Sequence, residues 1–314
     1  MKRLLTVITV IFFITPIYAQ QDPQFSLNMF NNAAINPGAS GSEDGVSASA
    51  LIHEQWLGFA GRPQTKVFNV NSAIPWEVLP FGAGLTIMTD NLGFNRNTLL
   101  DLQIAPRISV GNGVLGIGVG VGFNNQTISN SDWSIADMSS NPSNDPLIPN
   151  DESAMALDLS AGAFYQMDNF WAGFSARHLN NPLIEMGQTS QYTLLPTYYF
   201  SSGYQIALPN PLLELTPSVF VKSVEFNTTQ MDFSAVLEYD KRIWGGVTYR
   251  LEDAYVAMVG MKLMSGFSFG MAWDFPASDI GTYASGSVEF FGKYVFPLGL
   301  KQGKTGKSSL LNRN

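Results

Sequence analysis

The segment from Val114 to Gln126 alternates between large apolar residues and residues that are small or polar. Its odd positions are apolar from Leu115 to Phe123, while its even positions are glycine from Gly116 to Gly122 and amides at Asn124 and Gln126. A period of two predicts a β-strand with one apolar face. The glycines lead into no helix, which argues against a phosphate-binding loop. On this assignment Val119→Arg should impair membrane insertion, and the inward-facing Gly118→Ser should be much milder.

The same alternation recurs along the chain, and no helical pattern is available to cover the apolar faces. Lipid is the simplest environment for them, and a closed barrel is the simplest structure, because a membrane tolerates no unpaired sheet edge. We therefore predict an all-β fold, a transmembrane antiparallel β-barrel of about 14 strands. Residues 192–207 alternate least regularly. The faces expected to point outward are those of Val46–Ile52, Phe81–Ile87, Leu100–Val110, Leu115–Phe123, Met155–Tyr165, Leu213–Val221, Phe233–Tyr239, Tyr255–Leu263, Phe267–Trp273 and Phe290–Leu298.

The predicted connections differ in length between the two ends of the barrel. Every second one is very short, and several of the others are long, above all 128–152 and 179–191. This asymmetry is typical of an outer-membrane barrel, and an even strand number places both termini on the periplasmic side. The connection 72–80 is an exception, since it is longer but lies on the short-turn side. The short turns are Asn112-Gly113, Asp168-Asn169, Pro209-Asn210, Asp240-Lys241 and Ser265-Gly266.

Composition and the chain ends support an exported membrane protein. Charged residues make up only 13% of the 314 residues, and there is no cysteine. Residues 1–19 have the basic start, apolar core and small final residue of a secretory signal, so Sec-type export to the outer membrane is expected. Residues 20–45 form an N-terminal segment, 46–298 the barrel, and 299–314 a basic flexible tail, either a solvated end or a tether for an acidic partner. The net charge of −8 argues against nucleic acid as a partner.

The N-terminal segment contains three large apolar residues with the spacing of one short helical face. These are Phe25, Met29 and Phe30, and Asn36-Pro37-Gly38 after them predicts a turn. A loose arm is one interpretation. We favour a segment folded into the barrel mouth, because large apolar side chains are wasteful on a free tail.

The inward faces of the predicted strands carry charges of both signs on neighbouring strands. Such a distribution favours a cross-strand network that fills and neutralises the lumen. A selective ion path would more often show one dominant sign. The inward charged residues are Asp90, Asp101, Arg107, Asp158, Arg177, Lys222, Asp232, Glu238, Arg242, Arg250, Lys262, Asp274, Glu289 and Lys293.

The sequence predicts no catalytic, cofactor-binding or metal-binding residue. There are two histidines, His53 and His178, whereas a hydrolase needs a nucleophile or carboxylate held against a histidine base. His178 follows a strand whose apolar residues share its face, so we expect it at the outer lipid interface. The acidic loop 128–152 lacks the spacing of an EF-hand, and an ordinary solvated loop is favoured over a weak calcium site.

Aromatic residues near strand ends are more often interface girdles than a binding box. Among these aromatic residues, Trp171 is the exception, because the alternation of its strand places it on the inward face together with Ser175 and Arg177. The residues assigned to the girdles are Trp56, Phe59, Trp76, Tyr165, Trp244 and Tyr249.

Several sequence blocks occur in the order found in one membrane-protein family. The run Asp22–Ser26, followed by Asn36-Pro37-Gly38, and the block Gln55–Thr65 resemble the start of the mature PorP/SprF proteins of the Bacteroidetes type IX secretion system. The second block looks like the family pattern QWxGFxGxPxT. The sequence departs from the family at His53, where arginine is usual, and at Val288, where histidine is usual. Later blocks that look like the family are Asp90–Gly93, Ser175–Leu179, Leu215–Ser218, Trp244–Arg250 and Gly286–Glu289.

This resemblance implies an outer-membrane component that supports export or surface display of a cognate cargo protein. It also implies partners among the periplasmic ring or lipoprotein components and the C-terminal sorting domain of the cargo. A passive porin for a small solute is the alternative, and a hydrolase that uses His178 is a third. The candidate structural or partner-contact residues are Phe25, Met29, Phe30, Gln55, Trp56, Gly58, Phe59, Gly61 and Pro63.

Overall fold

The computed structural model describes residues 22–76, 78–129, 151–186, 190–263 and 266–297. None of the helices in these ranges is long and apolar enough to cross a membrane. The expected signal peptide, the basic tail and most of the loop 128–152 lie outside the described residues, so the expectations for them stay predictions. The helical turns are η1 (Asn28–Phe30), α2 (Asn32–Ile35), η2 (Pro37–Ala39) and η5 (Asp279–Thr282).

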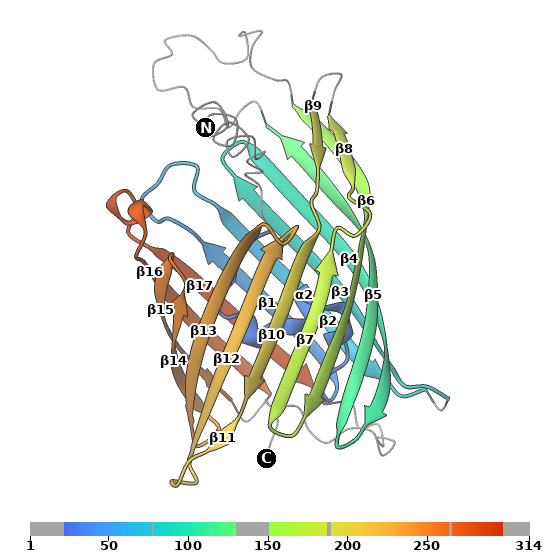
Figure 1. Ribbon diagram of the computed structural model, residues 1–314, viewed down its shortest axis with the longest axis vertical. Coiled ribbons are helices and arrows are strands. Elements are labelled where there is room, and N and C mark those ends of the chain that lie inside the picture. Colours follow the sequence, from blue (N-terminus) through green and yellow to red (C-terminus); the bar gives the residue numbers. More distant parts are fainter. Residues whose placement is uncertain (1–21, 77, 130–150, 187–189, 264–265, 298–314) are drawn as a thin grey trace, which may run out of the picture.

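The rest of the described chain is mainly β-strand, as the alternating pattern predicts (Figure 1). The strands are β1 (Val46–Glu54), β2 (Gln64–Ile74), β3 (Phe81–Leu92), β4 (Asn95–Val110), β5 (Gly113–Ile128), β6 (Glu152–Met167), β7 (Phe170–Arg177), β8 (Leu183–Met186), β9 (Ser190–Thr193), β10 (Thr197–Tyr204), β11 (Ile206–Ala207), β12 (Leu213–Val224), β13 (Thr228–Tyr239), β14 (Ile243–Arg250), β15 (Ala254–Lys262), β16 (Phe267–Pro276) and β17 (Ser287–Phe296).

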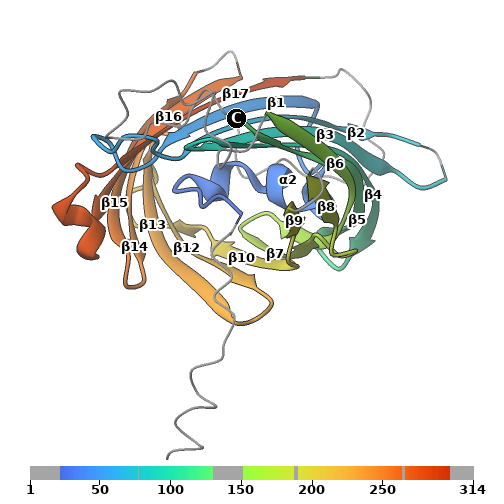
Figure 2. The same cartoon turned by 90° about the horizontal axis from the view of Figure 1, so that it is seen from above.

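The strands close into a barrel because the first pairs with the last. β1 and β17 are antiparallel, with Val46 opposite Phe296 and Glu54 opposite Val288. β10 pairs with both β7 and β12, and β11 continues along β12. Counting β10 and β11 as one strand, the described residues form a closed barrel of 14 antiparallel strands, which confirms the predicted fold class (Figures 1 and 2).

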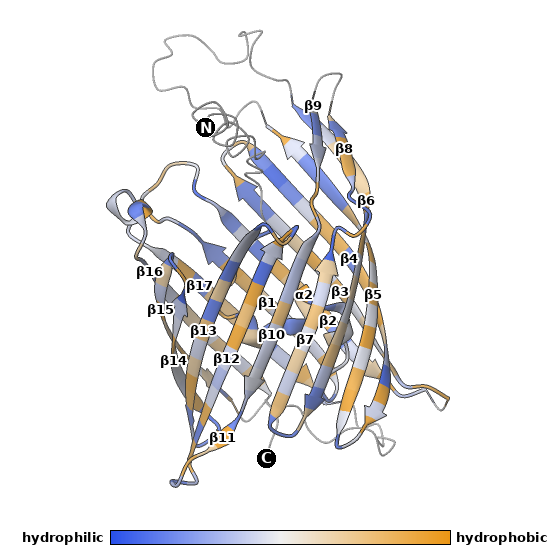
Figure 3. Cartoon of the chain, in the orientation of Figure 1, coloured by the Kyte–Doolittle hydropathy of each residue, from blue (hydrophilic) through white to orange (hydrophobic). Residues whose placement is uncertain are grey.

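The two faces of the wall differ as predicted. On β5, Ile117, Val119 and Val121 on the outer face are each about half exposed, at 49%, 51% and 49%, whereas the inward Asn124 is buried. Hydrophobic positions recur along β5 in Figure 3. Apolar side chains that face outward from a sheet with no second layer need lipid around them, so the strand faces fit a membrane barrel.

The connections define two ends of the barrel. At the inner end, where β1 begins and β17 finishes, neighbouring strands are joined by short turns such as 111–112 and 168–169. At the outer end the connections include the longer 55–63 and 178–196, the latter containing the β8–β9 hairpin, beside very short turns such as 93–94. Since the long loops of such barrels are extracellular, the longer connections 55–63 and 178–196 indicate that the opposite, inner end faces the periplasm.

Residues 192–207, where the alternation is weakest, form parts of three strands rather than one. Leu194 lies between β9 and β10 and is buried with Ile184, Met186 and Ile128. The period of two is interrupted here because the β8–β9 hairpin and the segment 194–196 after it pack against the lumen side of the barrel wall and do not form part of the wall.

Candidate functional site

Residues 22–45, called the plug below, lie in the lumen of the barrel. The plug runs from Asp22, which contacts His178 at the outer end of β7, to Glu43, which pairs with Lys293 in the inner half of β17. Leu27 is fully buried, and α2 stands inside the ring of strands in Figure 2. The preferred prediction of a segment folded into the barrel is therefore confirmed, and the loose arm is excluded. Phe25 belongs to the buried core cluster inside the barrel, and the partly buried Met29 and Phe30 pack against it.

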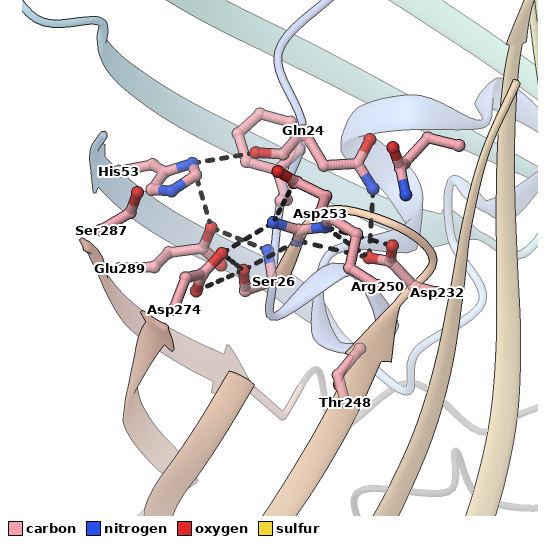
Figure 4. A network of polar contacts seen from close by, with 12 residues as sticks. Gln24, Ser26, His53, Asp232, Thr248, Arg250, Asp253, Asp274, Ser287 and Glu289 are labelled. Atoms are coloured by element: carbon pink, nitrogen blue, oxygen red, sulfur yellow. Dashed lines mark hydrogen bonds and ion pairs between the residues drawn. The ribbon is translucent and has the colours of Figure 1, made fainter. Parts of the chain in front are cut away.

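The plug is held at Ser26 by a buried cluster of charges (Figure 4). Arg250 of β14 lies between two carboxylates, with Nε 3.2 Å from Asp232 and Nη1 2.7 Å from Asp274. The Ser26 hydroxyl donates to Asp274 at 2.8 Å and accepts from Nη2 of Arg250 at 3.0 Å. Hydrogen bonds that involve charged groups are stronger than those between neutral groups. This cluster therefore ties the plug to three strands of the wall, β13, β14 and β16.

A second carboxylate binds the backbone of the same turn. Glu289 of β17 accepts from the backbone N–H of Ser26 at 2.9 Å and of Leu27 at 2.7 Å. His53 of β1 lies beside it, with Nδ1 2.9 Å from the carbonyl oxygen of Gln24 and 3.5 Å from Glu289. Both side chains are fully buried. Their neighbours are the backbone of the plug, so they hold the segment and present no accessible nucleophile or base.

The outer end of the plug is held at Asp22. Nε2 of His178 lies 3.0 Å from Asp22 Oδ1, and Nδ1 lies 2.8 Å from Asp158 Oδ2. The Tyr199 hydroxyl also donates to Asp22, and Lys222 Nζ donates to the Asp22 carbonyl oxygen at 2.7 Å. The wall therefore holds Asp22 by its carboxylate, through His178 and Tyr199, and by its backbone carbonyl oxygen, through Lys222.

Burial and pairing act in opposite directions on these two groups. Burial lowers the pKa of His178, but the charge of Asp22 and the contacts with Asp22 and Asp158 outweigh it and raise the pKa to about 9. Burial raises the pKa of Asp22, but the charge and hydrogen bond of His178, with the charge of Arg177, hold that pKa well below its ordinary value. The pair is therefore ionised at neutral pH.

Apolar contacts hold the middle of the plug. The Phe30 ring stacks on Trp244 of β14 with ring centroids 4.5 Å apart and lies 5.9 Å from the ring of Phe291. Trp244 is buried, so its assignment to an interface girdle is wrong. Its indole faces the lumen, where Gly260 and Gly270 leave room for it: a Cβ at either glycine would lie within 2.4 Å of the ring.

The glycines of β5 make a groove for the plug. A Cβ at Gly118 would lie 2.3 Å from the carbonyl carbon of Pro37, and one at Gly116 would lie 2.1 Å from the Gly38 carbonyl oxygen. The expectation that Gly118→Ser is mild is therefore wrong, because the bare inner face is occupied by backbone. In the predicted turn Asn36-Pro37-Gly38, which begins η2, the Asn36 side chain accepts from the Gly38 N–H at 2.9 Å.

The block Gln55–Thr65 forms the β1–β2 connection at the outer end. Its two ends are joined by a hydrogen bond from the Gln55 N–H to the Pro63 carbonyl oxygen at 3.0 Å. The Leu57 N–H donates to Gly286 at 2.8 Å, and the Gly93 N–H donates to Gly61 at 3.0 Å. Positive φ angles at Trp56 (51°), Gly58 (93°) and Gly61 (71°) give the unusual backbone path, and Phe59 is exposed. A partner-contact role for this block remains a prediction.

Most predicted inward charges do face the lumen, and two residues are corrected. Arg242 lies in the turn after β13 with 59% of its side chain exposed, since the strand ends at Tyr239 and its phase does not extend that far. His178 was expected at the lipid interface but is buried against the plug, because φ of +57° turns its side chain inward. Trp171 is buried inside, as predicted.

The residues that hold the plug were not predicted from the sequence. Asp22 and Ser26 come from the first family-like block, His178, Arg250 and Glu289 from later ones. The available signal was that all five residues fall within the short sequence blocks that resemble the family. The sequence carried no indication that these blocks meet in space.

A closed antiparallel barrel with an apolar exterior and a polar interior defines an integral outer-membrane protein. The model of one family, described as the type IX secretion system membrane protein PorP/SprF, matches residues 17–294. The chain belongs to the PorP/SprF family of type IX secretion system membrane proteins. No curated protein matches it.

Several solved outer-membrane barrels are similar at low sequence identity. Omp33 of Acinetobacter baumannii is 6% identical, with a TM-score of 0.46 over 82% of this chain and 100% of that chain. The Ralstonia pickettii toluene transporter TbuX is 11% identical, with a TM-score of 0.47 over 86% and 93%. The translocator domain of the autotransporter NalP from Neisseria meningitidis is 14% identical, with a TM-score of 0.43 over 82% and 90%. These likenesses are too distant to indicate a transported molecule.

Proposed function

We propose that this protein is an outer-membrane component of the type IX secretion system that supports export or surface display of a cognate cargo protein. The family supports a place in the secretion machinery. On this proposal the protein acts by binding other proteins and holds no cofactor. Its partners are a periplasmic ring or lipoprotein component at the inner end and the C-terminal sorting domain of the cargo.

The observation that favours this role over a passive porin is the anchored plug. A porin needs a continuous aqueous path, whereas here the chain's own residues 22–45 extend along the lumen from Asp22 to Glu43. Their contacts include the buried Arg250 cluster and Glu289, which are costly to break because a buried charge would lose its partners. A barrel filled in this way is suited to being a scaffold rather than a solute channel.

The test is deletion of the gene, followed by mass spectrometry of secreted and cell-retained proteins and by uptake assays with small solutes. We expect one or a few proteins to move from the secreted to the retained fraction while solute uptake stays normal. Re-expression of the intact chain is the control and should restore secretion. Unchanged secretion together with impaired uptake would replace the secretion role with the porin.

A further inference from the structure

The outer end of the barrel contains a cavity of about 410 Å³ that the proposed function does not use. Its walls come from the start of the plug, the β1–β2 connection, β9 and the outer parts of β3, β4 and β12. This volume lies within the range of about 300–1,000 Å³ that is usual for small-molecule sites. Side chains that line it include Asp22, Trp56, Asp90, Asn97, Tyr192 and Lys222.

Hydrogen-bond acceptors at this cavity lack partners. Gln24 is 92% buried, and its Nε2 donates to Asp232 at 3.1 Å, which fixes the orientation of the amide. Among the described residues no donor reaches Gln24 Oε1 or the buried Asn97 Oδ1. Asp90 accepts from the Thr65 hydroxyl at 2.6 Å but has no ion-pair partner within the described part of the chain. These two amide oxygens are themselves closed off from solvent, so the acceptor that a ligand in the cavity can use is the Asp90 carboxylate.

The same cavity also offers donors and aromatic surface. Lys222 Nζ gives one hydrogen bond to the Asp22 carbonyl oxygen at 2.7 Å, and an ammonium group has two further N–H groups. The Gln55 amide also lines the cavity. Trp56 is held by a left-handed backbone conformation with φ of 51° in the β1–β2 connection, and Tyr192 lines the cavity from β9. A ligand that fits must therefore both donate and accept hydrogen bonds and must present some apolar surface.

We propose that this outer cavity binds a sugar ring of a glycan. Each sugar hydroxyl donates and accepts, which matches the carboxylate, amide and ammonium groups, and the C–H face of the ring can pack on Trp56 or Tyr192. A simple cation fits less well, because it offers the Lys222 ammonium no acceptor and is repelled by its charge. The cavity lies at the outer end of the barrel, and glycans outside the cell occur both on outer-leaflet lipopolysaccharide and in soluble form. The inference does not depend on the secretion role.

The experiment uses the mature protein, purified in detergent and shown to be folded by heat-modifiable gel mobility. One arm measures binding to an array of defined soluble oligosaccharides, a second measures binding to lipopolysaccharide from the producing cells, and a third uses a random-peptide library. Trp56→Ala and Asp90→Asn should each weaken glycan binding roughly tenfold, since each removes a ring contact or a charged acceptor. Trp56→Phe should retain most of the affinity. The matched control is Ser218→Ala. Ser218 lines a different cavity, beside Met29 and Glu43 of the plug, so this variant should bind glycans like wild type.

Binding in the first arm, weakened by both cavity variants, supports a soluble glycan as the source, and binding in the second arm alone supports the lipid-linked glycan. Binding to peptides only, or glycan binding that the cavity variants leave unchanged, would overturn the proposal. No binding in any arm by folded protein would overturn it as well.

Discussion

His178 Nε2 lies 3.0 Å from Asp22 Oδ1, although the two residues are 156 positions apart in the chain. The other ring nitrogen of His178 lies 2.8 Å from Asp158 on β6. With a carboxylate close to each ring nitrogen, the imidazole is held in its protonated, positively charged form, and its pKa is raised to about 9. One imidazolium thus joins the first described residue of the plug to the wall, and the left-handed φ of 57° at His178 is the strain that this geometry requires.

The attachment of the outer end of the plug should depend on pH. The pKa of His178 in the folded protein is raised to about 9, so its stabilisation is complete below about pH 6.5 and is lost as pH rises through 9. Exposure of the plug should increase by up to about tenfold per pH unit in this window and then level off. Hydrogen exchange at residues 22–27 from pH 6 to 10 measures it.

His178→Gln is the control for this prediction, because it removes the titrating group while keeping a donor. When the exchange rates of both proteins are corrected for the base-catalysed rise of the intrinsic rate with pH, the variant plug should be less protected than wild type at pH 6.5 and show little further change up to pH 9. A step of equal size in both proteins would assign the pH dependence to another group. At acidic pH the sign is reversed, since protonation of Asp22, whose pKa is lowered, removes its stabilisation as pH falls.

Removing the central cation should release the plug. Arg250→Met leaves the carboxylates of Asp232 and Asp274 buried without their counter-charge, and breaking such a pair costs about 3–5 kcal/mol. In an Ala34→Cys background, where the wild-type side chain is 2% exposed, a maleimide should react slowly with the intact protein and much faster when Arg250 is replaced. Val78→Cys, at 88% exposure, gives the rate of a free thiol.

The surface ion pair Arg242–Asp240, at 3.5 Å, provides the matched control for the loss of an arginine. Arg242→Met should change stability by less than about 1 kcal/mol, because both side chains are largely exposed. Slow labelling of Ala34→Cys in the Arg250→Met protein would mean that the apolar contacts of Phe30 hold the plug without help from the charges.

The barrel could be predicted from the sequence because its signal is local. The period of two in Val114–Gln126 places each side chain on one of two faces, and the exposed Val119 and buried Asn124 follow directly. The alternation of short and long connections indicated that the two ends of the barrel differ. The plug could be predicted only as an apolar segment that needs burial, since its position depends on contacts such as that of Ser26 with Asp274, 248 residues apart.

Two of the errors, at His178 and Arg242, have the same physical origin. Periodicity assigns a side chain to a face only while the strand continues, and His178 and Arg242 both come after a strand has ended. Trp244 was assigned by residue type instead, yet it faces a lumen that Gly260 and Gly270 make wide enough for an indole. A glycine in a strand is ambiguous in the same way, because it can face empty space or another backbone.

A charge on the lipid-facing side of β5 should impair the barrel. Val119 is 51% exposed near the middle of this strand, and an arginine there costs about 2–4 kcal/mol if it lies near the bilayer midplane. We expect Val119→Arg to lower the urea midpoint of the protein folded in lipid vesicles. Val78→Arg, in the exposed connection between β2 and β3, is the control and should leave the midpoint nearly unchanged. Equal loss in both would place Val119 outside the lipid.

The inward neighbour of Val119 tests the plug rather than the membrane. A Cβ at Gly118 would lie 2.3 Å from the Pro37 carbonyl carbon, closer than any real contact allows, so Gly118→Ser must displace η2 or bend β5. We expect faster maleimide labelling of Ala34→Cys and, in planar bilayers, conductance events that the wild-type protein lacks. Gly292→Ala on β17 is the matched control, since a Cβ there meets nothing within 4 Å. If Gly118→Ser labels as slowly as Gly292→Ala and stays silent, the plug is not seated in the glycine groove of β5.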